Sequence, residues 1–124
     1  MAKSEGKGSA AAPHLPLTPA TFQILMTLAV GEHHGYAIMK EVAESTDGAV
    51  RLGPGTLYGS LKRLLDGGLV AECGERADPE LGDDRRRYYR ITKLGMAVAR
   101  AEAKRLDSVV RTARRKRLIG PRSA

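Results

Sequence analysis

The side chains best suited to chemistry in this sequence are basic, and they fall into two groups. Lys62 and Arg63 lie within one segment of helical apolar periodicity, and three consecutive arginines occupy positions 85–87. Lysine and arginine neutralise phosphates, and either can donate hydrogen bonds to O6 and N7 of guanine. Two basic residues alone more often mark a solvated helix face, so this chemistry requires a fold that brings both groups to one surface.

Catalytic and metal chemistry have little support. The sequence has no glycine-rich phosphate loop, no nucleophile elbow and no paired catalytic carboxylates, so we expect neither an enzyme nor a bound cofactor. Glu32, His33 and His34 could ligate a metal, but His14 is the only other histidine, so we expect no metal and an exposed pair. Cys73 is the single cysteine, and in a strand it is more often a small buried hydrophobe than a thiol sensor.

Composition and charge narrow the class of protein. The chain has 124 residues and a formal net charge of +7, which indicates one domain with a polyanionic partner, either nucleic acid or an anionic membrane surface. No apolar run reaches the roughly 18 residues of a membrane span, and residues 1–12 lack the apolar core of a signal peptide. A single cysteine fits a reducing compartment. We therefore expect a cytoplasmic protein without a membrane partner.

Apolar periodicity predicts three short helices in the first half of the chain. Thr18 and Pro19 can cap and open the first helix, in which positions 22, 25, 26 and 29 form an apolar stripe. The second helix covers about 36–45. The third begins near Pro54, and its leucines at 57, 61, 64 and 65 share one face.

A β-hairpin and a long helix are expected to follow. Segments 69–76 and 85–92 alternate like strands on either side of an acidic loop, and Thr92 can cap a final helix that runs to about Leu118. This order predicts a mainly α fold with a small β-hairpin, the winged helix-turn-helix. We divide the chain into a disordered N-terminal arm (1–16), a winged helix-turn-helix DNA-binding domain (17–95), a C-terminal dimerisation helix (96–118) and a basic tail (119–124).

The third helix would present its polar side to DNA, because helix-turn-helix modules read bases with residues near the N-terminus of this helix. Thr56, Gly59, Lys62 and Arg63 lie opposite the leucines, with Tyr58 at the margin. Gly59 has two interpretations of equal weight, close approach to DNA and tolerated variation. The arginines at 85–87 would grip the DNA backbone or minor groove, and charge pairing with acids across the loop is the alternative.

The final helix carries a heptad pattern. Its apolar or small residues are spaced by 3, 4, 3, 4 and 3 positions, which suits a partner helix. A helix of about 26 residues spans about 39 Å, too long to lie wholly on so small a domain, although packing on the first helix of the same chain is the alternative. We therefore expect a homodimer whose interface includes Phe22, Met96, Ala99, Ala103, Leu106, Val110 and Ala113.

Four motifs carry a resemblance to a known family. They are His34–Ile38, Pro54–Leu64, Gly68–Val70, and Arg87–Thr92 followed by Gly95. Over about residues 17–95 the chain resembles the PadR family of transcriptional regulators, and its single C-terminal helix resembles the short-form subfamily. The resemblance implies a dimeric repressor that binds an inverted-repeat operator and is released by a ligand or stress signal. The chain departs from the family pattern at position 59, where many members have proline.

Together these observations predict the partners and the contacts. We expect double-stranded DNA and a second copy of the chain as partners, and the resemblance allows an unidentified small-molecule effector. A winged helix that joins proteins without specific DNA binding is the alternative. The expected DNA contacts are Tyr36, Pro54, Gly55, Thr56, Tyr58, Gly59, Lys62, Arg63, Arg85, Arg86 and Arg87.

Overall fold

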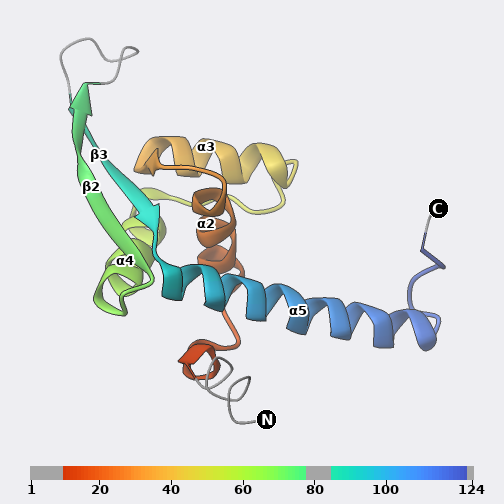
Figure 1. Cartoon of the computed structure of the whole chain (residues 1–124). Coiled ribbons are helices and arrows are strands. Elements are labelled where there is room, and N and C mark those ends of the chain that lie inside the picture. The colour runs from red at the N-terminus through yellow and green to blue at the C-terminus, as the bar shows by residue number, and fades with distance from the viewer. Residues whose placement is uncertain (1–9, 78–84, 123–124) are drawn as a thin grey trace.

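Helices make up most of the chain in the computed structural model, which describes residues 10–77 and 85–122 (Figure 1). The order of elements confirms the predicted mainly α fold with a hairpin wing, to which one short strand is added. The elements are η1 (Ala12–His14), α2 (Pro19–Ala29), β1 (His33–His34), α3 (Gly35–Ser45), α4 (Pro54–Asp66), β2 (Val70–Ala77), β3 (Arg85–Ile91) and α5 (Lys93–Arg115).

Two helices begin at side-chain caps that the sequence predicts. Thr18 Oγ1 accepts a hydrogen bond from the Thr21 amide (3.1 Å) at the start of α2, where Pro19 occupies the first turn. Thr92 Oγ1 accepts from the Gly95 amide (3.0 Å) at the start of α5. Such caps satisfy amides that the first helical turn leaves without a partner. Both predicted starts are therefore confirmed.

The apolar faces of α2, α3, α4 and α5 meet in one core. The leucine face predicted for α4 is confirmed, because Leu57, Leu61 and Leu64 are at most 4 % exposed. Burying a leucine side chain of this size contributes about 2 kcal/mol to folding. This burial fixes the opposite side of α4 as its solvent face.

The apolar stripe predicted for α2 was partly wrong. Met26 is 39 % exposed, whereas Ile24 and Leu28, which the stripe omitted, are almost fully buried. Helix α2 lies against α3, α4 and α5 at once, so it buries a broader face than a single stripe at helical spacing would give.

The sheet contains three antiparallel strands in the order β1-β3-β2. Strand β1 is only His33–His34 and lies in a segment that the sequence assigns to a loop, because a strand of two residues is too short to show periodicity. A β-bulge interrupts β2 between Glu72 and Glu75, where Gly74 has a φ of +100°. The bulge changes which face of the hairpin the following residues occupy.

The N-terminal segment differs from the disordered arm that its composition predicts. Residues 10–14 form helical turns, and Ala11 is only 2 % exposed. Leu15 and Leu17 also pack against the core. Apolar contacts therefore hold residues 10–16 in place, although the small residues of this segment predicted little burial. Residues 1–9 of the predicted arm and the acidic loop at 78–84 lie outside the described residues.

Helix α5 runs from the base of the wing across the domain and then beyond it (Figure 1). Its first half is fixed in the core, where Val98 is fully buried. Its 23 residues span about 34 Å at about 1.5 Å per residue, and in the distal part Val109 and Val110 are 54 % and 39 % exposed. Neither α5 nor any other helix in the described parts of the chain is long and apolar enough to cross a membrane.

Candidate nucleic-acid interface

Helix α4 presents a polar face opposite its buried leucines. Thr56, Lys62 and Arg63 are exposed, and Tyr58 is 48 % exposed. The structure therefore places these four residues on one solvent-facing side, as the sequence predicts. Two cations and two hydroxyl groups on one exposed helix face can contact phosphates and base edges.

The N-terminus of α4 is open as well as exposed. Gly53 at the N-cap position supplies no side-chain cap, and Pro54 occupies the first turn. A Cβ added at Gly53 or Gly55 would meet no described atom within 4 Å. First-turn amides at the positive end of a helix dipole suit a phosphate.

Each basic side chain of α4 has one local contact. Lys62 Nζ lies 3.3 Å from Asp66 Oδ2, and Arg63 Nη2 donates to Ser60 Oγ at 3.3 Å. Exposed pairs of this kind contribute little to stability, so both cations can exchange them for phosphate. A Cβ at Gly59 would lie 3.8 Å from Arg63 Nη1. The described part of the chain therefore does not require glycine at 59, and both interpretations of Gly59 stay open.

Aromatic side chains connect α4 to the wing. A Cβ added at Gly35 would lie 2.9 Å from Tyr58 Cζ, so the Tyr58 ring rests directly on the start of α3. The next residue, Tyr36, is 49 % exposed, and Arg86 Cζ lies 5.1 Å from the centre of its ring. Cation–π contacts occur at this distance. Tyr58 on α4, Tyr36 on α3 and Arg86 on β3 thus lie around the start of α3, and we name these residues, with the exposed face of α4, the basic-aromatic surface.

The three wing arginines do not all lie on one face of the hairpin. Successive side chains of a strand point to opposite faces, so the backbone of β3 places Arg86 on one face and Arg87 on the other. Arg87 Nε lies 3.5 Å from Glu72 Oε1, and Arg87 Nη2 lies 3.7 Å from Glu75 Oε2. These two carboxylates offset the charge of Arg87. The side chain of Arg85 lies outside the described residues. The expected three-arginine grip is thus divided, with charge pairing at Arg87 and aromatic contact at Arg86.

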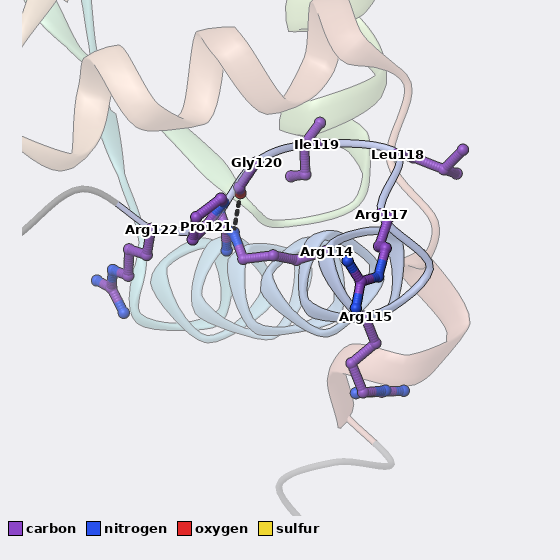
Figure 2. A pocket seen from close by; sticks show the side chains of 8 residues that line it. All are labelled: Arg114, Arg115, Arg117, Leu118, Ile119, Gly120, Pro121 and Arg122. Atoms are coloured by element: carbon purple, nitrogen blue, oxygen red, sulfur yellow. Dashed lines mark hydrogen bonds between the residues drawn. The ribbon is translucent and has the colours of Figure 1, made fainter.

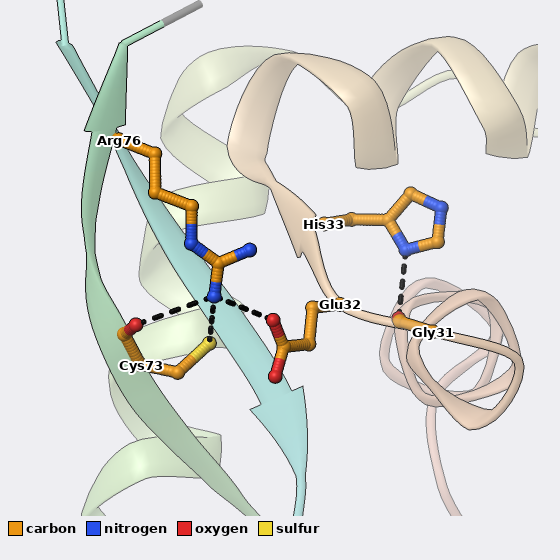
Figure 3. A network of polar contacts seen from close by, with 5 residues as sticks. All are labelled: Gly31, Glu32, His33, Cys73 and Arg76. Carbon is orange, nitrogen blue, oxygen red and sulfur yellow. Dashed lines mark hydrogen bonds and ion pairs between the residues drawn. The ribbon is translucent and has the colours of Figure 1, made fainter.

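A polar network between β2 of the wing and the segment after α2 was not predicted from the sequence (Figure 3). Arg76 Nη2 donates to Glu32 Oε1 at 2.5 Å and to the Cys73 carbonyl at 3.4 Å, and its guanidinium lies 4.4 Å from the centre of the Tyr88 ring. The hydrogen bond from Arg76 lowers the pKa of the Glu32 carboxyl, and Glu32 raises the pKa of Arg76. Burial is the main cause that raises the pKa of the Cys73 thiol. Glu32 and Arg76 are 44 positions apart, and no local pattern joins them.

The two adjacent histidines have structural contacts. His34 is 9 % exposed, its Nδ1 accepts from the Ala37 amide (3.1 Å), and its ring meets the Tyr88 ring edge-on at 5.3 Å. The expectation of an exposed pair was therefore wrong for His34, which caps α3. His33 Nδ1 lies 2.8 Å from the Gly31 carbonyl oxygen. Within residues 10–77 and 85–122 no three His, Cys, Asp or Glu side chains gather as a metal site.

The heptad positions of α5 divide between two environments. Ala99 is only 7 % exposed within the chain's own core, which leaves little of it for a partner, and here the intramolecular alternative holds. Further along, Val110 is 39 % exposed. Phe22 and Leu106 face a cavity of about 450 Å³ between α2 and α5. Of the residues predicted for the dimer interface, those that the chain's own core leaves uncovered are therefore Phe22 and the residues in the distal half of α5.

A buried carboxylate ties α5 to the segment before α2. Glu102 is 1 % exposed, accepts from Arg105 Nε and Nη2 at 2.6 and 2.9 Å, and accepts from the Leu17 amide at 3.2 Å. The hydrogen bonds from Arg105 are the main cause that lowers the pKa of the Glu102 carboxyl, against an opposing effect of burial. This contact sets the start of α2 relative to α5.

The basic tail folds back beside the end of α5 (Figure 2). Arg114 Nε donates to the Gly120 carbonyl at 2.9 Å, and Arg117 has a left-handed φ of 63°. The open cavity of about 570 Å³ beside it is lined by four arginines, two exposed aliphatic side chains, one glycine and one proline: Arg114, Arg115, Arg117, Arg122, Leu118, Ile119, Gly120 and Pro121. Residues 123–124 of the predicted tail lie outside the described residues.

Three helices followed by an antiparallel wing define the winged helix-turn-helix class of DNA-binding folds, to which this chain adds the long helix α5. Residues 24–101 match the transcriptional regulator PadR-like family. The chain belongs to this family, whose members are transcriptional regulators rather than enzymes. Among curated proteins no sequence matches the chain significantly.

Solved structures agree with this fold. A transcriptional regulator from Clostridium thermocellum is 25 % identical with a TM-score of 0.64, over 77 % of this chain and 89 % of that one. A PadR family transcription regulator from Clostridium difficile is 23 % identical with a TM-score of 0.68, over 79 % of this chain and 97 % of that one. Bacillus subtilis PadR, solved in complex with operator DNA, is 23 % identical with a TM-score of 0.58, over 73 % of this chain and 48 % of that one.

Proposed function

We propose that this transcriptional regulator is a dimeric, sequence-specific repressor that binds an inverted-repeat operator through α4 and the wing. The observation that carries the proposal is the basic-aromatic surface, on which Tyr58, Tyr36 and Arg86 connect the exposed face of α4 to β3. The fold resembles that of Bacillus subtilis PadR, which was solved with operator DNA. Release by a small molecule or a stress signal is part of the same proposal.

The proposed contacts divide into positioning and reading. The open N-terminus of α4, with Pro54 and Gly55, receives a phosphate, and the exposed Thr56 lies near base edges in the major groove. Lys62 and Arg63 neutralise phosphates or donate to guanine. Arg86 reaches the backbone or minor groove beside α4. Arg87 has a smaller role, because Glu72 and Glu75 already offset its charge.

The proposed dimer uses the distal half of α5. Val110 and its exposed neighbour Val109 extend past the domain, and Phe22 and Leu106 line an unfilled cavity beside them. A second copy would cover these apolar groups. Binding to an inverted repeat requires this two-fold pairing to place the two α4 helices about 34 Å apart, one turn of DNA. Sedimentation equilibrium of Val110→Asp against Val30→Asp tests this, because Val30 is an exposed valine just after α2. Only Val110→Asp should shift the protein to monomer.

The test of DNA binding is a fluorescence anisotropy titration with the duplex upstream of the protein's own gene. Lys62→Ala and Arg63→Ala should each raise Kd about tenfold, the loss expected for one good base or phosphate contact. Arg100→Ala is the matched control, because it removes one exposed cation from α5. Equal effects of all three variants, or weak and sequence-blind binding by the wild type, would overturn the proposal. The second result would favour the protein–protein adaptor instead.

A further inference from the structure

Three side chains beside the wing meet from distant parts of the chain, two of which, Glu32 and Arg76, are drawn in Figure 3. Glu32 follows α2, Arg76 lies near the end of β2, and Tyr88 lies in β3. Arg76 donates to Glu32 along one edge of its guanidinium and covers the Tyr88 ring with its face. Arg76 thus has contacts with two distant parts of the chain, whereas Lys62 on α4 pairs with Asp66, four residues further along the same helix.

We propose that Glu32, Arg76 and Tyr88 form a clasp that fixes the wing against the helix-turn-helix unit, so that Arg76 is a positioning residue for DNA binding and not a DNA contact. This inference rests on the proposed function, because it concerns how the wing is held for DNA. We name these three residues the wing clasp.

The β-bulge makes the clasp possible. Glu72 is opposite Tyr89 and Glu75 is opposite Arg87, so β2 has one extra residue between these pairs. An extra residue shifts every later side chain to the other face of a strand. The left-handed φ of +100° at Gly74 accommodates the bulge. Without it, Arg76 would point away from Tyr88 and Glu32.

The clasp is coupled to the helix-turn-helix unit through His34. The Tyr88 ring, covered by Arg76 on its face, meets the His34 ring at 5.3 Å, and His34 caps α3 at the Ala37 amide. Arg86 lies two residues before Tyr88, on the same face of β3, and contacts Tyr36 in the first turn of α3. Any rotation of the wing relative to α3 would therefore move Arg86 away from the rest of the basic-aromatic surface.

The sign of one charge effect separates the clasp from ordinary surface electrostatics. Glu32 is an acid on a protein with a formal net charge of +7, so its removal alone should strengthen binding to phosphates. The clasp predicts the opposite result, because loss of Glu32 releases Arg76 and loosens the wing.

The first experiment measures Kd for the upstream duplex with the full-length chain. Glu32→Ala should raise Kd about three- to tenfold, the size of coupling expected between contacting groups. Glu44→Ala is the matched control, because it removes an exposed acid of α3 that forms no ion pair in the described part of the chain, and it should leave Kd unchanged or lower. In an Arg76→Ala background, Glu32→Ala should no longer raise Kd. The clasp would be overturned if Glu32→Ala and Glu44→Ala changed Kd by the same factor. It would also be overturned if Glu32→Ala raised Kd as much in the Arg76→Ala protein as in the wild type.

A second experiment reads the clasp without DNA. Hydrogen–deuterium exchange of the free protein should become faster in 70–77 and 85–91 for Glu32→Ala, with α4 unchanged, while Glu32→Gln, which keeps an acceptor for Arg76, should have a smaller effect. Unchanged exchange in the wing would overturn the clasp whatever the protein does with DNA. If the wild type shows no preference for the upstream duplex, the proposed function fails, and faster exchange in the wing would still support the clasp.

Discussion

Glu102→Gln isolates the contact that ties α5 to the start of α2. Glutamine keeps the shape of the side chain but replaces one carboxylate oxygen with an amide that donates. Glu102 accepts three hydrogen bonds, two from Arg105 and one from the Leu17 amide. At least one of these donors must then lose its acceptor inside a site that is 1 % exposed.

The expected cost follows from that count. A hydrogen bond to a charged group contributes about 1.5–3 kcal/mol, and because the Arg105 side chain is 40 % exposed we take the lower part of that range. Glu102→Gln should therefore reduce the free energy of unfolding by about 2 kcal/mol, or about 8 °C in Tm for a domain of this size. The control is Asp107→Asn on the same helix, whose carboxylate is 64 % exposed and pairs with Arg111. It should change stability by less than about 0.5 kcal/mol.

The pH dependence gives the same contact a second signature. The pKa of the Glu102 carboxyl is lowered in the folded chain, so its contribution is complete above the unfolded value of about 4.3 and is lost as pH falls through the lower folded value. Urea unfolding at fixed protein concentration should therefore show a constant gap between wild type and Glu102→Gln from neutral pH down to about pH 5, closing on further acidification. A gap that does not depend on pH, or one no larger than that of Asp107→Asn, would refute the reasoning.

Three further predictions concern glycine contacts and the thiol. Gly95→Ala should lower the free energy of unfolding by about 2–3 kcal/mol in urea, because its Cβ would collide with the Leu69 carbonyl oxygen; a neutral result would show that α5 can shift. Gly35→Ala should displace the Tyr58 ring and weaken operator binding, while the free energy of unfolding changes by less than about 1 kcal/mol. An unchanged Kd would show that Tyr58 is not a DNA contact. Because burial raises the pKa of Cys73, its alkylation by iodoacetamide should still accelerate above about pH 8.5, and a plateau below that pH would contradict the raised pKa.

Local signals in the sequence were sufficient for the helices that position the site. The spacing of Leu57, Leu61 and Leu64 predicted both the buried face of α4 and the exposure of Lys62 on the other side. Thr92 predicted the start of α5 because a side-chain cap acts within three residues. These features depend only on neighbours along the chain, so one sequence is enough to find them.

Contacts between residues far apart in the sequence could not be predicted from such local signals. The pairing of Glu32 with Arg76 depends on the bulge at Gly74 and on the two-residue strand β1. The burial of Ala99 in its own core likewise depends on where α5 crosses α2, because a heptad pattern does not state which helix it faces. The placement of Arg86 and Arg87 on opposite faces, by contrast, follows from strand alternation alone.

Salt dependence of operator binding tests the central claim most directly. The wild type, Arg86→Ala and Arg87→Ala should be titrated with the upstream duplex and with a shuffled duplex of equal composition, over a series of salt concentrations. We predict a preference for the upstream duplex of at least about 10³-fold in the wild type, a slope of log K against log salt that is smaller by about one for Arg86→Ala, and a nearly unchanged slope for Arg87→Ala. Equal slopes for the two variants, or equal affinity for the two duplexes, would contradict the account.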